Sequence, residues 1–217
     1  MRVAILAGGL GTRLGEIARD LPKPMVPIGD RPFLEFVIES FAQRGLHDFV
    51  LLTGYRSELI EKHFADGAGF GVHIEYSRER QPLGTGGAIR QARHLLGDRF
   101  LLTYGDVLRR FDYDRFVREH SDPCLAVYPR ISAGNTDIAG DRVIRFDKRA
   151  PELPYIDAGF CVMPSSVIDW LGDKTSFEEI VFPRLAVERR LACEVIDQNF
   201  LEIGTPEDLE RTRKALA

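Results

Sequence analysis

The stretch LAGGLGTRL (residues 6–14) begins at the end of the apolar run 3–6 and places three glycines in four positions. A short buried strand that leads into a glycine-rich loop is typical of a parallel α/β sheet with a ligand at its edge. Glycines let successive backbone N–H groups face a phosphate without an intervening Cβ atom. We therefore expect an anion-binding loop at the carboxyl end of the first strand.

Two common phosphate-binding loops do not fit this stretch. A Walker loop requires GxxxxGK[ST], and a dinucleotide loop requires GxGxxG, whereas Leu14 stands where the third glycine belongs. Arg13 lies near the start of the next helix, where a cation opposes the helix dipole at a mild cost. An anion between the arginine and the loop would explain its presence there. The alternative interpretation is a glycine-rich turn with a solvent-exposed arginine.

A second motif, LPKPM (residues 21–25), holds Lys23 between two prolines. A residue that precedes proline is restricted to extended geometry, so the lysine is presented on a stiff backbone. About eight residues separate this motif from the glycine loop, and GDRPFLE follows at the start of the next helix. This long composite pattern favours a functional lysine over a structural turn with a solvated side chain.

Apolar runs alternate with helical patterns along the first half of the chain, which predicts a Rossmann-like α/β fold with a mostly parallel sheet flanked by helices. Predicted strands are 3–6, 49–53, 72–77, 100–104, 125–128, 156–163, 192–197 and 199–202, with a hairpin at 135–146. Predicted helices are 32–44, 57–64, 87–96, 112–119, 176–187 and a last one that begins at Thr205. We expect a single domain over 1–217, with halves of about 1–128 and 129–217, the second small and β-rich.

Composition limits the classes of partner. The net charge is −4, from 33 acidic and 29 basic residues, so no global basic field would attract nucleic acid. No apolar run approaches the ~20 residues that span a bilayer, and the apolar N-terminal run is too short for a signal peptide. We therefore predict a cytoplasmic protein that binds neither nucleic acid nor a membrane. Three widely spaced cysteines and five histidines show no zinc-binding pattern.

The composite LAGGLGTRL…LPKPMVPIGDRPFLE resembles the sugar-1-phosphate nucleotidyltransferases, which make NDP-sugars from an NTP and a sugar 1-phosphate. The resemblance covers essentially the whole chain and implies the nucleotide-diphospho-sugar transferase type of fold. Its further motifs are PLGTGGA at 82–88, YGDV at 104–107, FDK at 146–148, DAG at 157–159 and LEIGTP at 201–206. Two positions depart from the family pattern: Glu202 replaces the usual aspartate, and Asp157 replaces the usual asparagine.

The resemblance implies catalytic roles for Arg13, at the β- and γ-phosphates, and Lys23, at the α-phosphate and the incoming sugar phosphate. It also implies Mg²⁺ as cofactor, held by Asp106 and Glu202. Mg²⁺ suits one or two carboxylates together with water and substrate phosphates. Similar enzymes often form dimers or tetramers, so a homo-oligomer is compatible with the resemblance.

Binding residues follow from the same motifs. The implied nucleotide-binding set is Leu6, Ala7, Gly8, Gly9, Gly11, Thr12, Glu79, Gln81, Gly84 and Thr85. The implied sugar-phosphate-binding set is Tyr104, Gly105, Lys148, Asp157 and Gly159. A phosphate monoester is largely dianionic at pH 7, so this reaction needs charge neutralisation and positioning rather than a general base.

The base and the sugar are less constrained. Glu79 could accept from N1–H and N2–H₂ of guanine, whereas Gln81 could pair with uracil or thymine. LPKPMVPIGDRPFLE and LTYGDV look most like the branch that guanylylates heptose 1-phosphates, which implies GTP and D-glycero-D-manno-heptose 1-phosphate. The alternative within the family is UTP, dTTP or CTP with a hexose 1-phosphate.

Two further alternatives lie outside this activity. A nucleotide-sugar-dependent glycosyltransferase uses a D-x-D metal motif, and Asp112 and Asp114 fit that string. However, they stand where a helix is expected to begin, and acidic residues stabilise the first turn of a helix. A catalytically silent nucleotide-sugar-binding subunit is suggested only by the glutamate at position 202.

Overall fold

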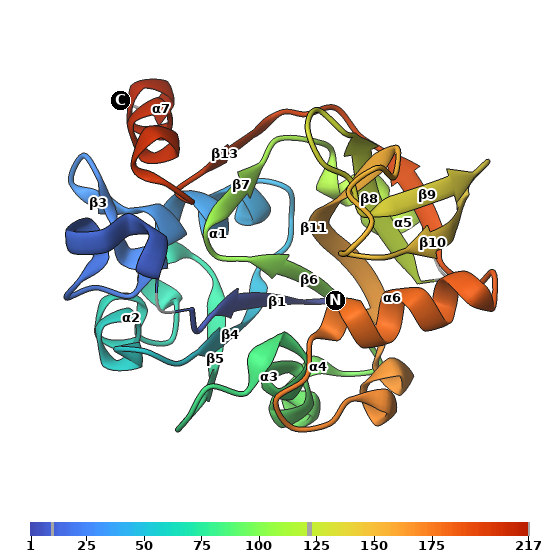
Figure 1. Ribbon diagram of the computed structural model, residues 1–217. Coiled ribbons are helices and arrows are strands. Elements are labelled where there is room, and N and C mark those ends of the chain that lie inside the picture. Colours follow the sequence, from blue (N-terminus) through green and yellow to red (C-terminus); the bar gives the residue numbers. More distant parts are fainter. Residues whose placement is uncertain (10, 121–122, 217) are drawn as a thin grey trace.

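The structure, a computed structural model, describes residues 1–9, 11–120 and 123–216. A large sheet runs through it in the strand order β5-β4-β1-β6-β11-β8-β12-β10-β9. Its strands are β1 (Arg2–Ala7), β4 (Asp48–Thr53), β5 (His73–Arg78), β6 (Arg99–Tyr104), β8 (Cys124–Pro129), β9 (Thr136–Ala139), β10 (Arg142–Phe146), β11 (Tyr155–Pro164) and β12 (Ala192–Val195). Figure 1 shows β5 toward one end of this sheet and the β9–β10 hairpin at the other.

Strand direction differs between the two halves of the sheet. β1 is parallel to β4 and β6, and β4 is parallel to β5. β11 then runs antiparallel to both β6 and β8, and β10 runs antiparallel to β9 and β12. The predicted parallel arrangement thus holds for the first half, while the second half is mixed because β11 enters beside β6 in the opposite direction.

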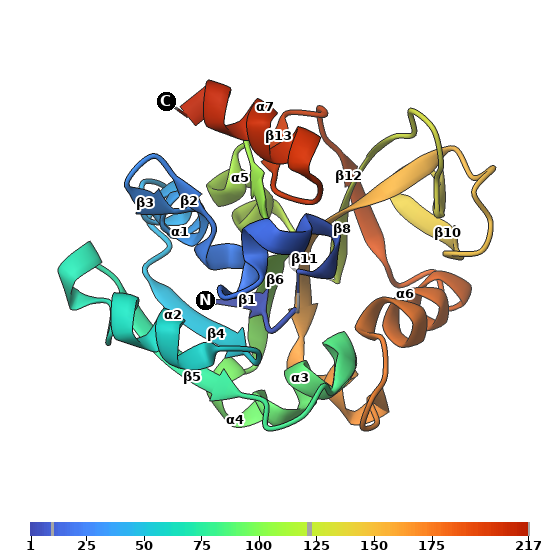
Figure 2. The same cartoon turned by 60° about the vertical axis from the view of Figure 1, so that its left-hand side comes forward.

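Helices cover both faces of the sheet. The α-helices are α1 (Phe33–Ala42), α2 (Ser57–Phe64), α3 (Gly84–Gln91), α4 (Arg93–Leu96), α5 (Tyr113–Glu119), α6 (Phe177–Val187) and α7 (Pro206–Leu216). Short 3₁₀ helices are η1 (Thr12–Ala18), η2 (Lys23–Met25), η3 (Ala68–Phe70) and η4 (Ser165–Trp170). Apolar side chains of α1, α2, α5 and α7 pack in one core, and those of α3, α4, η4 and α6 pack in a second core on the opposite face (Figures 1 and 2).

The expected elements are present with small shifts of their ends. The helix expected at 87–96 is two helices, because α3 begins earlier, at Gly84, and ends at Gln91 before α4. The short strands β2 (Pro27–Ile28), β3 (Arg31–Pro32) and β7 (Val107–Arg109) were not expected from the sequence, since each is only two or three residues long.

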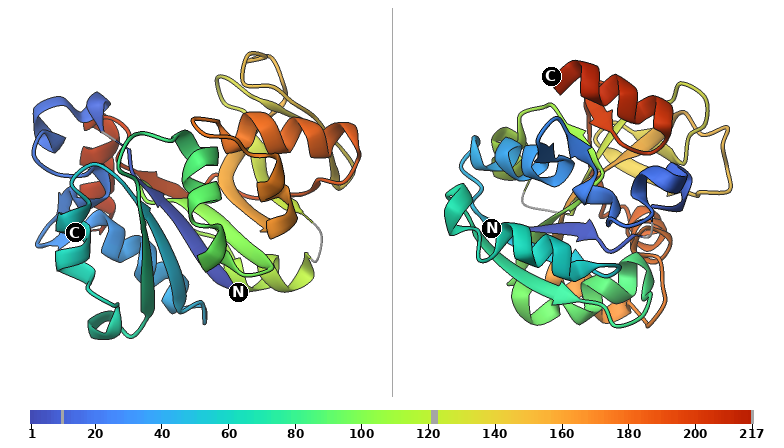
Figure 3. Two further views of the ribbon diagram at one scale, coloured as in Figure 1. Left: turned by 90° about the horizontal axis from the view of Figure 1, so that it is seen from below. Right: turned by 90° about the vertical axis from the view of Figure 1, so that its left-hand side faces the viewer.

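The end of the chain returns to the first half. β13 (Phe200–Glu202) pairs with β7, and α7 then lies beside β2 (Figure 3). The Thr212 hydroxyl of α7 donates to the Glu202 carbonyl at 2.7 Å, which fixes β13 against the helix. This return brings the LEIGTP motif to the strand that follows the YGDV motif.

Two simple expectations from composition can be compared with the structure. All three cysteines are buried and free, as expected from their wide spacing and the lack of a zinc-binding pattern. Among the described residues, none of the helices is both long and apolar enough to cross a membrane.

Candidate active site

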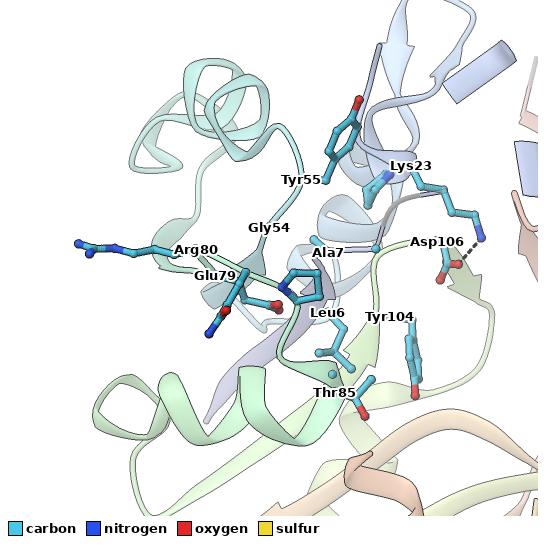
Figure 4. Close-up of a pocket in the computed structure, with 16 residues that line it drawn as sticks. Leu6, Ala7, Lys23, Gly54, Tyr55, Glu79, Arg80, Thr85, Tyr104 and Asp106 are labelled. Carbon is cyan, nitrogen blue, oxygen red and sulfur yellow. Dashed lines mark hydrogen bonds and ion pairs between the residues drawn. The ribbon is translucent and has the colours of Figure 1, made fainter. Parts of the chain in front are cut away.

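A cavity of about 480 Å³ opens where β1, β4, β5 and β6 end (Figure 4). This is the edge at which open α/β sheets bind ligands. The predicted site residues that line it are Leu6, Ala7, Gly8, Gly9, Lys23, Glu79, Gln81, Gly84, Thr85, Tyr104 and Asp106. The structure therefore brings both glycine motifs, the PKPM lysine and the YGDV aspartate to one cavity.

Other predicted residues lie outside the lining of this cavity. Arg13 is exposed on η1, and Gly11 precedes that helix in the left-handed conformation, with φ of 63°. The side chain of Thr12 lies outside the part of the chain that the structure describes. Gly105 is buried, and its N–H donates to the Leu6 carbonyl at 2.9 Å. The remaining ones, Lys148, Asp157, Gly159 and Glu202, belong to the neighbouring groups of side chains described below.

The first glycine loop lies against the residue predicted to select the base. A Cβ atom on Gly8 would lie 3.0 Å from Glu79 Oε1, so a side chain at this position would crowd the carboxylate. The other oxygen, Oε2, accepts from the Leu83 N–H at 3.0 Å. Burial raises the pKa of Glu79, although this hydrogen bond opposes the shift. In Figure 4 the Arg80 side chain extends away from the cavity, while Glu79 faces it.

Lys23 is held at the floor of the site. It begins η2, between Pro22 and Pro24, and is only 7% exposed. Its Nζ lies 2.5 Å from Asp106 Oδ2, an ion pair that joins the PKPM and YGDV motifs. A buried ammonium of this kind can also form charge-assisted hydrogen bonds with an incoming phosphate.

Two predicted metal ligands are adjacent. β13 pairs antiparallel with β7, so that Glu202 is opposite Val107, and the Ile203 N–H donates to the Asp106 carbonyl at 3.2 Å. Burial and the charge of Asp208 raise the pKa of Glu202, and Asp106 contributes in the same direction. Sequence spacing alone, nearly a hundred residues, does not predict this proximity; the β7–β13 pairing explains it.

The donor set of this pair fits a hard divalent cation. Asp106 and Glu202 offer carboxylate oxygens, and Lys23 and Arg109 are the cations whose charge acts on Glu202. In the described part of the chain no cluster of three or more His, Cys, Asp or Glu side chains is arranged to hold a metal. Mg²⁺, which keeps several waters and takes substrate phosphates as ligands, suits such a two-carboxylate site.

Glu178 forms the centre of a buried hydrogen-bond network. It is 3% exposed and lies in the first turn of α6. Its Oε2 accepts from the Thr85 hydroxyl at 2.9 Å and from the Ser176 hydroxyl at 2.7 Å, and its Oε1 accepts from the Tyr104 hydroxyl. Lys148 Nζ lies 3.4 Å from Oε2. One carboxylate therefore connects the nucleotide-side Thr85 with the predicted sugar-phosphate residues Tyr104 and Lys148.

The pKa values of Glu178 and Tyr104 shift in opposite directions. Although burial opposes ionisation, hydrogen bonds from Ser176 and Tyr104 hold the pKa of Glu178 below its ordinary value. Burial, with the neighbouring charges of Glu178 and Asp157, raises the pKa of Tyr104 well above its ordinary value. Tyr104 thus stays a hydrogen-bond donor to an ionised carboxylate.

Asp157, which departs from the family pattern, is held by Asn135. The Asn135 amide donates to Asp157 Oδ2 at 2.8 Å, and the Gly159 N–H donates to Oδ1 at 2.9 Å. Burial raises the pKa of Asp157, and these two hydrogen bonds oppose the shift. Gly159 has φ of 64°, and a Cβ there would lie 2.8 Å from the Tyr104 ring. The DAG motif therefore packs against Tyr104.

The D-x-D string has a structural explanation. Asp112 caps α5 by accepting from the Arg115 N–H at 2.9 Å, and Asp114 forms an exposed ion pair with Arg118 at 2.9 Å. Neither aspartate lines the cavity. The observation that suggested a glycosyltransferase is thus accounted for by helix capping.

Several residues of the site were not predicted from the sequence. Residues 176–179, SFEE, have the sequence pattern of a capping box, and Ser176 does cap α6, accepting from the Glu179 N–H at 3.3 Å. Only Glu179 completes such a box at the third helical position, so the preceding glutamate had no capping role to explain it. Further unpredicted lining residues are Pro24, Gly54 and Tyr55. Gly54 and Tyr55 follow β4 directly, where parallel strands place ligand contacts.

Comparison with known proteins agrees with this geometry. Residues 2–128 match the nucleotidyl transferase family. The chain is 35% identical, over 96% of both sequences, to D-glycero-alpha-D-manno-heptose 1-phosphate guanylyltransferase of Campylobacter jejuni. It is 33% identical to the enzyme of the same name from Aneurinibacillus thermoaerophilus, over the full length of this chain and 98% of that enzyme.

A solved structure shares the whole fold. The crystal structure of HddC from Yersinia pseudotuberculosis complexed with GMP-PN superposes with a TM-score of 0.85 at 29% identity. The match covers 100% of this chain and 99% of the other. With the family match over more than half of the chain and relatives above 30% identity over nearly all of it, the chain belongs to the nucleotidyl transferase family.

Proposed function

We propose that this chain transfers a guanylyl group from GTP to D-glycero-D-manno-heptose 1-phosphate, which yields GDP-heptose and pyrophosphate. One observation carries the proposal: the glycine loop, the Lys23–Asp106 pair and Glu202 converge at the end of β1, beside a cavity large enough for a nucleotide. The full-length similarity to two heptose 1-phosphate guanylyltransferases supports the choice of both substrates.

The reaction is an in-line displacement at phosphorus. A phosphate oxygen of the sugar 1-phosphate attacks the α-phosphorus of GTP, and the bond from that phosphorus to the bridging oxygen of the β-phosphate breaks. Pyrophosphate leaves with that electron pair. Since the attacking phosphate is already largely dianionic at neutral pH, no side chain needs to remove a proton. The protein must instead position two anions and offset their repulsion.

Different residues of the site position the two substrates and neutralise their charge. Gly8 and Gly9 present backbone to the nucleotide phosphates, and Lys23 moves from Asp106 toward the α-phosphate and the incoming phosphate. Arg13 meets the leaving pyrophosphate. Asp106 and Glu202 would hold Mg²⁺, which supplies charge neutralisation at the phosphate oxygens when it is bound. Lys148, beside Glu178, contacts the sugar phosphate.

Guanine selection rests on Glu79. Its carboxylate lies at the cavity wall, with Oε2 on the Leu83 N–H and Oε1 next to Gly8. Guanine offers two adjacent donors, N1–H and N2–H₂, which a carboxylate can accept, whereas uracil and thymine offer one donor flanked by acceptors. Gln81 is more exposed and is the residue that would serve a pyrimidine base.

The setting is the cytoplasm. Three free, buried cysteines fit a reducing compartment. The substrates are an NTP and a sugar 1-phosphate, and the net charge of −4 disfavours nucleic acid as a partner.

The test is an activity panel that crosses GTP, UTP, dTTP, CTP and ATP with heptose, mannose and glucose 1-phosphates, read as pyrophosphate release. We expect the highest kcat/KM for GTP with the heptose 1-phosphate. A maximum at a pyrimidine nucleotide overturns the base assignment, and a maximum at mannose or glucose 1-phosphate overturns the sugar assignment. Nucleotide binding without pyrophosphate release from any pair indicates a silent subunit.

A further inference from the structure

Arg109 is a buried arginine that neither the motifs nor the proposed mechanism uses. It ends β7, three residues after Asp106, and lies opposite Phe200 in the β7–β13 pair. Only 9% of its surface is exposed. Because a guanidinium cannot lose its proton in a protein, this position keeps a positive charge inside the molecule.

The guanidinium lacks a full set of partners. Within the described part of the chain, Nε and Nη1 of Arg109 are buried without a hydrogen-bond partner. Its Cζ lies 4.5 Å from the ring centre of Phe200 and 5.6 Å from that of Tyr128. Ring faces attract a cation but accept no conventional hydrogen bond, so they leave these two N–H groups unsatisfied.

Arg109 borders the sugar-phosphate side of the site. Its Nη2 lies 3.7 Å from the position that a Cβ on Gly159 would take, next to the Tyr104 ring. Its charge also acts on Glu202, lowering a pKa that burial otherwise raises. Arg109 is not among the residues that line the nucleotide cavity; it lines a second cavity, together with Arg44 and Asn199.

We propose that Arg109 binds the anionic phosphate of the sugar 1-phosphate. This inference rests on the proposed function, and it adds a sugar-phosphate-binding residue to that site. A buried guanidinium with two unsatisfied N–H groups, and with no ion-pair contact to a carboxylate among the described residues, is costly in the substrate-free protein. An arriving phosphate dianion offsets that cost with charge-assisted hydrogen bonds. Gly159, with no side chain, lets the Tyr104 ring pack beside Nη2 of Arg109, so that the guanidinium adjoins a predicted sugar-phosphate residue.

The test compares Arg109→Met, which keeps apolar volume, with Arg109→Lys, which keeps charge. Each variant is titrated calorimetrically, with Mg²⁺ present, against D-glycero-D-manno-heptose 1-phosphate and separately against GTP. We expect Arg109→Met to raise the Kd for the sugar phosphate about tenfold or more and to leave the Kd for GTP within about twofold. The Lys variant is expected to recover part of the loss.

The matched control is Arg110→Met, which removes a charge from the next residue, an exposed arginine that lines the second cavity beside Arg109. Its affinities for both ligands should equal those of the wild type. If Arg109→Met leaves sugar-phosphate affinity unchanged, or weakens both ligands alike, the arginine is only a brace between Phe200 and Tyr128 and the inference is overturned. The inference is also overturned if the wild type does not bind the sugar phosphate.

Binding of both ligands by the wild type without pyrophosphate release contradicts the proposed function alone. The affinities of the variants then still decide the role of Arg109.

Discussion

The two sides of the candidate site are built in different ways. On the proposed nucleotide side, four glycines contribute backbone to the cavity wall: Gly8, Gly9, Gly54 and Gly84. On the sugar-phosphate side, polar and charged side chains are buried together, with Glu178 at the centre of bonds from Thr85, Ser176, Tyr104 and Lys148.

This difference separates two ways of binding an anion. A glycine loop offers N–H groups whose positions are set by contiguous sequence, so a triphosphate of standard shape can be held by a short motif. A buried side-chain network must be assembled from β6, α3, α6 and the loop after β10, and each member depends on the others. We therefore expect substitutions near the nucleotide phosphates to reduce kcat and those in the network to act on sugar-phosphate binding or on folding.

The largest effect is expected from Lys23→Met. Lys23 is 7% exposed and its ammonium pairs with Asp106, so under the proposed mechanism its loss removes a preorganised charge at the reacting phosphates. We expect kcat to fall about 10³-fold or more, with smaller changes in the KM of either substrate. Pyrophosphate release measures this, with Lys62→Met on exposed α2 surface as the control. Retained kcat would remove Lys23 from the mechanism.

Arg13→Ala tests the predicted role of an exposed arginine at the leaving pyrophosphate. Arg13 is exposed on η1, and glycines with positive φ at 11 and 15 flank it. We expect the rate to fall about 10²–10³-fold, as for the loss of one transition-state charge stabiliser. Thermal stability should hardly change because the side chain is exposed. An unaltered rate would favour the alternative of a solvated arginine in a glycine-rich turn.

Glu202→Gln tests the predicted Mg²⁺ ligands, which lie between the two sides of the site. The variant keeps the size of the side chain but removes one of two adjacent carboxylates, so the Mg²⁺ concentration for half-maximal rate should rise about tenfold. Because burial raises the pKa of Glu202, the wild-type carboxylate should also protonate at higher pH than an exposed glutamate. The Mg²⁺ requirement of the wild type should therefore increase as the pH falls toward 5, and that of the variant should change less. Identical metal titrations would reject Glu202 as a ligand.

Much of the architecture could be predicted from periodicity and motifs. Strand β1, helix α2 and the β9–β10 hairpin lie where the sequence indicated, because each is specified by local pattern and turn residues. The antiparallel entry of β11 between β6 and β8 was not predicted, since strand order depends on contacts between distant segments.

The candidate site was predictable to the same extent. Lys23, Asp106 and the glycines lie in contiguous motifs, and the structure gathers them at one cavity. Glu178 and Arg109 carry no motif that the sequence analysis recognised. A glutamate at the start of α6 is compatible with simple helix-dipole stabilisation, and an arginine at the end of β7 resembles a surface residue. Only burial, 3% and 9% exposed respectively, distinguishes them.

The smallest expected effect concerns stability rather than rate. Glu178 has a pKa below its ordinary value of 4.5, because hydrogen bonds from Ser176 and Tyr104 outweigh its burial. A carboxyl group with a lowered pKa in the folded state stabilises the fold above its unfolded pKa, and that contribution is lost as the pH falls through the folded value.

Glu178→Gln should therefore lower the free energy of unfolding by about 1–3 kcal/mol at pH 7. The difference from the wild type should shrink in urea titrations as the pH falls below the ordinary value of 4.5 and through the lowered folded-state pKa. Glu179→Gln, at the exposed neighbour, is the matched control and should be neutral across this pH range. If Glu178→Gln lowers the free energy of unfolding equally at every pH, the network stabilises the fold through packing alone. The two sides of the site would then differ in the packing of their side chains and not in their charge.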